Sequence, residues 1–416
     1  MKVFKFGGAS IKDASSIKNI LEIISNYSND NLLIVVSAMG KTTNALEKVV
    51  ENYFKNKSEL KSSILEVLNF HIDICNELFP KNHLIFSDIN SIFQKINTFI
   101  NSNKSPSYSF VYDQLVSNGE LISSKIIYNY MTFKNIESSF IDARDCIKTD
   151  SNFRGGNVKW DLTNKTIKQM FNDSNTNITQ GFIASDKNNF NVTLGREGSD
   201  YSAAIFAYAL NAESLSIWKD VPGLLNADPK FFSNTKLLKH ISYSETIELA
   251  FYGASIIHPK TLQPLQKKEI PLNVKSFKNP ESNGTKISKG IDIDPLVPCY
   301  IFKDNLILLK LSSLDFSFMV EQNISKIFKE LHDSKMKVDV IQNSAISFSV
   351  CFFDKYGNLN DLISRLEGKF KIEINKNVSL FTIRHFDEKS IKKISYNRKL
   401  LLEQRTEKTI RLIFSN

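Results

Sequence analysis

The sequence has few cysteines, and none is placed to form a familiar cysteine site. Four occur in 416 residues, at Cys75, Cys146, Cys299 and Cys351, and no two form a CxxC pair. Zinc sites and disulfide frameworks use closely spaced cysteines or histidines. The six histidines form neither an HExxH motif nor a cluster. We therefore expect reduced thiols and no metal site built from protein side chains.

Long apolar stretches are also missing. Apolar runs such as LLIVV at 32–36 have the length of one strand, whereas a membrane-spanning helix needs about 20 apolar residues. The first motif of interest begins at Lys5, which leaves no space ahead of it for a signal or transit peptide. Together with the cysteine usage, these features predict a cytoplasmic protein without a membrane segment.

Glycine and proline are scarce, with 15 and 10 residues, which argues against a low-complexity or disordered chain. A chain of this length predicts two or three domains with a substantial core. The net charge of +9 is mild for this length. It is compatible with anionic substrates, with nucleic-acid binding or simply with a basic proteome, so charge alone assigns no partner.

Strands and helices are expected to alternate through the first two thirds of the chain. A strand at 2–6 leads through Gly7 and Gly8 into an amphipathic helix, and a fully apolar strand follows at 31–38. The stretch 45–135 is predicted to be mostly helical, with an interruption at Gly119 and Glu120. Further strands are expected at 138–143, 177–185, 188–195 and 212–221. This alternation predicts a mostly parallel α/β sheet, whose ligands bind beyond the carboxyl ends of the strands.

The pattern changes after 287–298, where regular periodicity ends and two prolines appear. Residues 305–376 then read as strand, helix, strand, strand, helix and strand, the ferredoxin-like order. The tail, 387–416, predicts a short basic helical segment and one last strand. We therefore expect a first domain at 1–290 and a second at 298–416.

Three glycine-containing turns are candidates for ligand binding. KFGGAS at 5–10 offers a lysine and bare backbone N–H groups, which suit a phosphate. GKTT at 40–43 resembles the end of a P-loop, but that motif needs a glycine where Val35 stands, so a P-loop is rejected. In GREGSD at 195–200, Arg196 could bind a carboxylate and Asp200 a lysine or a metal, although Ser199 or Asp200 could equally cap the following helix.

In their order along the chain, five motifs resemble aspartate kinases of the amino acid kinase family. These motifs are KFGGAS, SNGE, GREGSD, DVPGLLNADP and ISYSETIELAFYGASIIHPKTL. The C-terminal region resembles that family's ACT regulatory region. The resemblance implies an α/β amino acid kinase fold, with a mostly parallel central sheet flanked by helices, as the catalytic domain at 1–290. It also implies a complete βαββαβ ACT unit at about 305–376 and a reduced second unit at about 377–416.

The resemblance further implies a reaction. Aspartate kinases transfer the γ-phosphoryl group of ATP to the side-chain carboxylate of L-aspartate, giving 4-phospho-L-aspartate, the first step towards lysine, threonine and methionine. The implied cofactors are ATP and Mg²⁺, the latter bound through the nucleotide phosphates. The implied partners are L-aspartate, lysine or threonine as an effector, and a second copy of the chain that joins through the ACT region, with no nucleic acid and no membrane.

Site residues follow from matching each motif to the family pattern. The implied catalytic residues are Lys5 and Asp200. The implied aspartate-binding residues are Ser37, Thr43, Glu120, Phe182, Arg196 and Ser199. The implied nucleotide-binding residues are Lys5, Gly7, Gly8, Lys219, Asp220, Leu225, Lys230 and Ser255. For an effector the resemblance implies Asp339 and Asn343, and a purely structural, dimerising ACT region is the alternative.

Three positions depart from the family pattern. Glu197 stands where a glycine is common, Leu225 where a tyrosine is common, and Ser255 where a lysine is common. Since Lys5, Glu120, Arg196 and Asp200 all match, we interpret the chain as an active variant. The alternatives are a non-catalytic amino-acid sensor and another amino acid kinase that acts on glutamate, acetylglutamate or a nucleotide.

Overall fold

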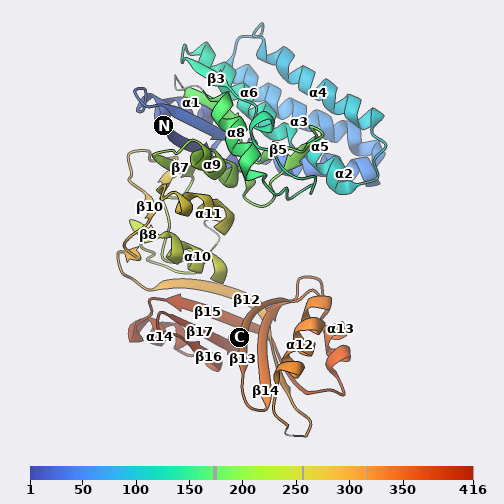
Figure 1. Cartoon of the computed structure of the whole chain (residues 1–416), viewed down its shortest axis with the longest axis vertical. Coiled ribbons are helices and arrows are strands. Elements are labelled where there is room, and N and C mark those ends of the chain that lie inside the picture. The colour runs from blue at the N-terminus through green and yellow to red at the C-terminus, as the bar shows by residue number, and fades with distance from the viewer. Residues whose placement is uncertain (172–175, 255–256, 316, 416) are drawn as a thin grey trace. The chain divides into compact units, whose positions relative to one another are not determined.

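The computed structural model describes residues 1–171, 176–254, 257–315 and 317–415. The chain forms two compact units (Figure 1). The first unit contains residues 1–224, 237–247 and 256–294, and the second contains 225–236, 248–255 and 295–416. Two short segments, 225–236 and 248–255, therefore group with the second unit. The sequence-based division into 1–290 and 298–416 had placed both segments in the first domain.

The first unit is built on a nine-stranded sheet in the order β11-β8-β10-β9-β7-β1-β2-β4-β3. Its central strands, β7 (Ser214–Lys219), β1 (Lys2–Phe6), β2 (Leu32–Val36) and β4 (Thr176–Gln180), run parallel to one another. The outer strands are β3 (Ser138–Phe140), β8 (His240–Ser242), β9 (Leu272–Ser276), β10 (Thr285–Ser288) and β11 (Ile293–Asp294). Within this sheet, as far as the structure describes it, only the β9–β10 and β8–β11 pairings are antiparallel, so the predicted mostly parallel sheet is confirmed.

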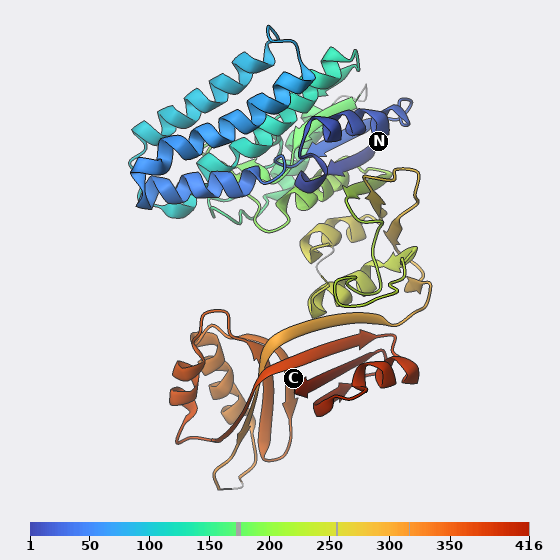
Figure 2. The same ribbon diagram turned by 180° about the vertical axis from the view of Figure 1, so that it is seen from behind.

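Helices of the predicted 45–135 stretch form a bundle at one end of the first unit (Figures 1 and 2). They are α2 (Thr42–Lys55), α3 (Lys57–Leu78), α4 (Ile85–Ser102), α5 (Tyr108–Val116) and α6 (Asn118–Phe133). The predicted interruption lies at Ser117, so that Gly119 and Glu120 belong to the first turn of α6. A Cβ at Gly119 would approach the Ala38 Cβ to 2.9 Å, which explains why glycine lets this helix begin so close to the sheet.

The remaining helices of the first unit flank the sheet. They are α1 (Ala14–Ser25), α7 (Ala143–Cys146), α8 (Trp160–Met170), α9 (Gly198–Ala209), α10 (Tyr243–Tyr252), whose last residues group with the second unit, and α11 (Pro259–Lys267). Helix α9 packs on β1, β2 and β7, and α6 packs on β3 and β4. The expected strand at 177–185 is interrupted, because Phe182 adopts φ +66° and the chain turns into a separate hairpin of β5 (Ile183–Ser185) and β6 (Asn191–Thr193).

Aromatic side chains fix β1 against β7. Phe6 and Trp218 are partners in the parallel register, and their ring centres lie 6.0 Å apart in a stacked arrangement. Phe4 meets the same indole edge-on at 5.6 Å, and all three side chains are at most 1% exposed. Because successive side chains of a strand point to opposite faces, Lys5 lies on the face opposite Phe4 and Phe6. This packing sets the relative position of Lys5 and Lys219, which ends β7.

The second unit contains a six-stranded antiparallel sheet in the order β13-β14-β12-β15-β17-β16. Along the chain it comprises β12 (Cys299–Ser312), α12 (Glu321–Asp333), β13 (Lys337–Asn343), β14 (Ser347–Phe353), α13 (Leu359–Leu366), β15 (Lys371–Arg384), α14 (Glu388–Ser395), β16 (Lys399–Arg405) and β17 (Thr409–Ser415). From β12 to β15 this is the βαββαβ order, which confirms the ACT-like fold predicted from the sequence.

The reduced second half of this unit is assembled from strands that the first half also uses. The end of β12 pairs with the start of β15, and the start of β12, Cys299–Lys303, pairs with the end of β15, Leu380–Arg384. Strands β17 and β16 extend that second half, and α14 is its helix.

The prediction of one helical segment and one last strand over 387–416 was wrong in one respect. The helical segment ends at Ser395, and a further strand, β16, precedes the last one.

A buried carboxylate in α5 allows a direct test of the first unit's packing. Asp113 is fully buried, and its carboxylate accepts hydrogen bonds from the N–H groups of Arg154 and Thr193, both at 2.9 Å, and from Thr193 Oγ1 at 2.7 Å. Replacing it leaves these buried donors without an acceptor. We therefore expect Asp113→Ala to lower the free energy of unfolding by about 3 kcal/mol in urea denaturation. The exposed Asp73→Ala on α3 is the control and should change it by less than about 0.5 kcal/mol. Equal unfolding midpoints for the two variants would contradict this assignment.

Candidate functional site

The candidate site is a cavity of about 410 Å³ at the carboxyl ends of β1, β2 and β7. This is the edge at which parallel α/β sheets bind ligands. Its walls come from the turns after β1 and β2, the first turn of α6, the segment before α9 and the end of β7. The lining residues are Lys5, Gly8, Ala9, Ser37, Ala38, Gly40, Thr43, Glu120, Phe182, Gly195, Glu197, Gly198, Ser199, Asp200 and Lys219.

A carboxylate held between two ammonium groups lies at the centre of the cavity. Lys5 Nζ is 2.5 Å from Asp200 Oδ1, and Lys219 Nζ is 3.5 Å from Asp200 Oδ2. Burial raises the pKa of Asp200, but the two lysines together lower it by more. The net shift of the pKa is downward, so the carboxylate is ionised. With one negative and two positive charges the cluster is cationic, which suits an anionic ligand.

The turn after β1 differs from its sequence-based prediction. Gly8 begins a single 3-10 turn, Gly8–Ser10, and α1 begins only at Ala14, because Asp13 caps it by accepting a hydrogen bond from Ser16 N–H at 2.8 Å. The amphipathic helix predicted after the two glycines is therefore confirmed, but it does not follow them directly. A Cβ on Gly8 would lie 2.6 Å from the Ala38 carbonyl oxygen, so glycine is required where the turns after β1 and β2 meet. The first N–H groups of a helical turn have no partner within it and face a ligand readily.

Glu120 is a second buried acid in the cavity. Its side chain comes from the first turn of α6 and accepts a hydrogen bond from Ala38 N–H on Oε1 at 3.3 Å. Its other oxygen has no hydrogen-bond partner among the described residues. Burial raises the pKa of Glu120 to about 8, against the smaller opposing effects of the Ala38 hydrogen bond and the charge of Lys5. A cationic group that binds beside this carboxyl group would therefore favour loss of its proton.

The segment before α9 has an unusual backbone. Gly195 has φ +77°, and Glu197 has φ +53° and forms the N-cap of α9 without a capping side-chain hydrogen bond. Neither Ser199 nor Asp200 caps the helix, which corrects that alternative; both lie in its first turn. Arg196 stands between two lining residues with an exposed side chain that forms no ion pair with any described residue. Arg196 itself is not among the lining residues, so among the implied aspartate-binding residues it is the one that the cavity does not include.

The other implied aspartate-binding residues are also brought together. Ser37 follows β2, Thr43 lies in the first turn of α2, and both line the cavity. Phe182 lines it too, with its N–H donating to Ser202 Oγ at 2.9 Å, which fixes the turn after β4 against α9.

The nucleotide-binding residues are only partly gathered. Gly7 adjoins the cluster, since a Cβ there would lie 3.5 Å from Lys5 Nζ, and Asp220 is an exposed residue directly after Lys219. Leu225 and Lys230 belong to the second unit, and Ser255 lies outside the described residues. Their role at the nucleotide stays a prediction.

The implied effector residues lie on β13 of the second unit. Asp339 is already paired there, with its Oδ1 2.5 Å from Lys303 Nζ and its backbone oxygen accepting from Arg411 Nη2 at 2.7 Å. Asn343 ends the same strand and is exposed. The carboxylate is thus engaged by an ammonium of the chain itself.

Sequence reasoning missed part of the lining. It assigned no role to Ala9, Ala38, Gly40, Gly195 and Gly198, although four of them lie in the three glycine-containing turns that it selected, and it noted Glu197 only as a departure from the family pattern. The signal for Ala38 and Gly40 was their place between Ser37 and Thr43, which were both assigned to the site, at the end of the apolar strand 31–38.

The structure also describes the cysteines, the histidine and acidic side chains, and the long helices of the chain. All four cysteines are buried and free, as expected. Among the described residues no group of three histidine, cysteine or acidic side chains is placed to hold a metal ion. In the same residues no helix is both long and apolar enough to span a bilayer.

Comparisons with known proteins connect this geometry to a family. A model of the amino acid kinase family matches residues 1–276. The lysine-sensitive aspartokinase 3 of Escherichia coli (strain K12) is 29% identical over 396 residues, which cover 92% of this chain and 86% of that protein. The bifunctional aspartokinase/homoserine dehydrogenase of Buchnera aphidicola subsp. Acyrthosiphon pisum is 29% identical over 406 residues. The match covers 92% of this chain, which spans about half (49%) of the Buchnera protein.

Solved structures agree with these matches. Escherichia coli aspartokinase III in complex with lysine and aspartate superposes with a TM-score of 0.83 at 25% identity, covering 99% of this chain and 95% of that one. Clostridium acetobutylicum aspartate kinase shares the fold with the same score at 23% identity, over 100% of this chain and 96% of that one. The resemblance predicted from the five motifs is thus confirmed, and the chain belongs to the amino acid kinase family.

Proposed function

We propose that this chain is an aspartate kinase, which converts L-aspartate and ATP into 4-phospho-L-aspartate and ADP. The observation that carries the proposal is the buried cluster of Lys5, Asp200 and Lys219 at the carboxyl edge of the sheet. Similarity to aspartokinases over 92% of the chain, across both units, supports aspartate as the acceptor in preference to other amino acid kinase substrates.

The reaction needs charge stabilisation more than proton transfer. The side-chain carboxylate of aspartate has a pKa near 3.9 and is already an anion at neutral pH. One of its oxygens attacks the γ-phosphorus while the bond from that phosphorus to the bridging β–γ oxygen breaks, so no general base is required. Two anions must nevertheless approach in line, and fixed cations lower the barrier by stabilising the charge shared among the phosphoryl oxygens.

The cluster supplies those cations. Lys5 is positioned by Asp200, which fixes the ammonium group while leaving two of its three N–H donors for phosphate oxygens. Lys219 approaches the same carboxylate from β7 and adds a second positive charge. The N–H groups of the turn at Gly7 and Gly8 would hold phosphate oxygens beside them.

Magnesium fits this site through the nucleotide. Bound together with the nucleotide, Mg²⁺ would neutralise part of the phosphate charge. Asp200 provides carboxylate oxygens of the kind that Mg²⁺ prefers, but both are already paired with lysines. Asp200 would therefore help to hold the ion only together with the nucleotide phosphates.

The substrate side follows from the remaining lining residues. Arg196 is assigned to the α-carboxylate of aspartate and Glu120 to its ammonium group, with Ser37, Thr43 and Ser199 as hydrogen-bonding neighbours. The unpartnered Oε2 of Glu120 supports this assignment, because a buried acceptor without a partner gains most from an incoming donor.

The second unit is proposed as the regulatory and dimerising part. A lysine or threonine effector that uses Asp339 would have to displace or share the ammonium of Lys303, which already occupies that carboxylate. We therefore expect weak effector binding at this position, and a homodimer formed through the second unit stays part of the proposal.

The role of Lys5 is tested by removing its charge while keeping its length. Lys5→Met should lower kcat by about a thousandfold, because a cation that stabilises the transferring phosphoryl group is lost. ADP release coupled to NADH oxidation, with L-aspartate and MgATP, measures the change. Lys18→Met, on the exposed face of α1, is the control and should keep full activity.

Near-normal turnover by Lys5→Met would refute the assigned role. Calorimetric binding of aspartate by the unaltered chain without any ADP release would instead favour a non-catalytic sensor.

Glu120 gives the reaction a characteristic pH dependence. With its pKa raised to about 8, Glu120 is mainly protonated at pH 6, and binding the ammonium of aspartate requires that proton to leave. The kcat/KM for aspartate should therefore rise between pH 6 and pH 8, by up to about tenfold per pH unit, and level off above pH 8. Initial rates at low aspartate concentration measure it, and Glu120→Gln should flatten the profile while lowering its plateau. A steep profile in that variant would assign the titration to another group.

A further inference from the structure

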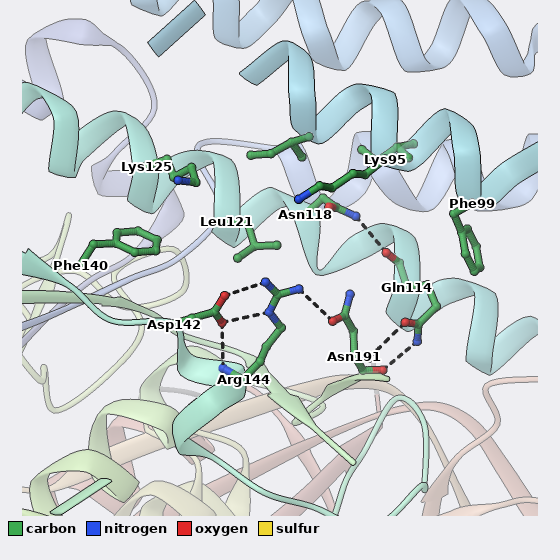
Figure 3. A pocket seen from close by; sticks show the side chains of 12 residues that line it. Lys95, Phe99, Gln114, Asn118, Leu121, Lys125, Phe140, Asp142, Arg144 and Asn191 are labelled. Carbon is green, nitrogen blue, oxygen red and sulfur yellow. Dashed lines mark hydrogen bonds and ion pairs between the residues drawn. The ribbon is translucent and has the colours of Figure 1, made fainter. Parts of the chain in front are cut away.

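A second cavity, of about 260 Å³, lies in the first unit and shares no lining residue with the candidate site (Figure 3). It is enclosed by α4, by α5 and α6, and by the segment from β3 to α7. The lining residues are Ile92, Lys95, Ile96, Phe99, Gln114, Asn118, Leu121, Lys125, Phe140, Asp142, Arg144 and Asn191. Nothing in the proposed reaction uses this cavity.

Its polar side is held in place by hydrogen bonds. The Arg144 guanidinium makes two bonds to Asp142, Nε to Oδ1 at 2.9 Å and Nη2 to Oδ2 at 2.6 Å, and a third from Nη1 to Asn191 Oδ1 at 3.1 Å. Asn191 is fixed in turn by Gln114, with which it exchanges two hydrogen bonds of 2.9 and 3.1 Å. These groups are therefore organised before any ligand arrives, which lowers the cost of binding.

The cavity has an excess of positive charge. Asp142 and Arg144 balance each other, which leaves Lys95 and Lys125 as the uncompensated charges in the lining. Lys95 forms no ion pair with any described residue, and Lys125 is 4.0 Å from Asp88 Oδ2 at the limit of an ion pair. Lys95 and Arg144 extend toward each other from opposite sides of the cavity (Figure 3).

The other walls are apolar. Ile92, Ile96 and Phe99 of α4 and Leu121 of α6 form these walls, and Phe140 closes one end beneath the Lys125 ammonium, which lies 5.0 Å from the ring centre.

We propose that this cavity binds a small organic anion, a carboxylate attached to an apolar body. The volume is just below the roughly 300–1,000 Å³ typical of ligand pockets, so the ligand is small.

Such a ligand would touch two elements that also build the candidate site. Leu121 and Lys125 of α6 face this cavity, while Glu120 of the same helix faces the other. Asn191 begins β6, and the chain continues from that strand to Gly195 and Arg196. Occupancy of the cavity is thus expected to alter aspartate binding, a consequence that rests on the proposed function, whereas the binding itself does not.

Binding is tested on the full chain with benzoate as the probe. We expect benzoate to raise the melting temperature and to give calorimetric binding in the millimolar range, whereas neutral benzamide and the small anion acetate give neither. The double variant Lys95→Gln/Lys125→Gln should bind benzoate at least tenfold more weakly. Lys57→Gln/Lys61→Gln, two exposed lysines of α3, is the matched control and should bind as the unaltered chain does.

The proposal is overturned if benzoate does not bind, if benzamide binds equally well, or if the Lys95/Lys125 double variant retains full affinity. Aspartate-dependent ADP release, measured at half-saturating benzoate, tests the coupling alone. Unchanged kinetics there would remove the coupling and leave the binding site intact.

Glu197 carries a second inference from an independent observation. A residue other than glycine rarely adopts φ +53°, and such a conformation at a functional site is kept only where surrounding contacts enforce it. Here the Glu197 carboxylate accepts the backbone N–H of His258 at 2.9 Å, and His258 caps the N-terminus of α11, which packs on α9. The bond thus joins the start of α9 to the start of α11.

We infer that Glu197 is a positioning residue for Arg196. The bond to His258 N–H anchors the backbone directly after Arg196 and turns the Glu197 carboxylate toward a donor instead of toward an anionic substrate. Since the side chain of Arg196 forms no ion pair with any residue that the structure describes, the anchored backbone is what orients it. This inference rests on the proposed role of Arg196 in binding aspartate.

Three substitutions distinguish the effect of the hydrogen bond to His258 N–H from other effects of changing Glu197. Glu197→Gln retains an acceptor oxygen, whereas Glu197→Ala and Glu197→Gly remove it, and glycine also relieves the backbone. We expect both truncated variants to raise the KM for aspartate about tenfold with kcat changed less than threefold. Glu197→Gln should restore most of the affinity. Hydrogen exchange at the His258 amide should quicken in the truncated variants and not in Glu197→Gln.

The exchange measurement needs no enzymatic activity, so it separates failure of this inference from failure of the proposed function. Unchanged exchange at His258 in Glu197→Ala would overturn the inference. Faster exchange with an unchanged KM for aspartate would also overturn it.

Discussion

One buried ion pair, between Lys5 on β1 and Asp200 in the first turn of α9, links the packing of the first unit to the chemistry of its site. A lysine at the end of a parallel strand is expensive to bury unless a carboxylate meets it, and Asp200 is in turn ionised because Lys5 and Lys219 lower its pKa. The pair therefore requires β1, β7 and α9 to keep fixed relative positions. Phe4, Phe6 and Trp218 provide that constraint from the opposite face of β1. Core packing and site chemistry are in this way two consequences of the same strand register.

The same register explains why so much of the site could be predicted from the sequence. The apolar strands at 2–6 and 32–36 end in glycine-containing turns, and parallel strands bring such turns to one edge of a sheet. Lys5 and Gly8 belong to the first of these turns, Ser37 and Thr43 were implied by the family resemblance, and all four line the cavity. Glu120, Phe182, Ser199 and Asp200 followed from the family motifs and line the same cavity. The βαββαβ order of the second unit could be predicted because its strands and helices alternate with clear periodicity.

What the sequence did not reveal depends on contacts between distant residues. The left-handed backbone of Glu197 is held by the N–H of His258, and no local pattern around position 197 shows that bond. Helix α1 begins late because Asp13 caps it, although the pattern after Gly8 suggested an earlier start. Strand β16 was missed because its seven residues, KLLLEQR, show no alternation of apolar and polar positions; pairing with β17 makes it a strand. Similarly, the pairing of Asp339 with Lys303 joins strands far apart in the sequence.

The most direct test of the central claim is a crystal structure of the chain with L-aspartate, Mg²⁺ and a non-hydrolysable ATP analogue. We expect the Lys5 ammonium within hydrogen-bonding distance of a γ-phosphate oxygen, still held by Asp200, with the aspartate side chain in line with the γ-phosphorus. A γ-phosphate bound elsewhere in the cavity, with Lys5 paired to Asp200 and touching no phosphate oxygen, would contradict this expectation.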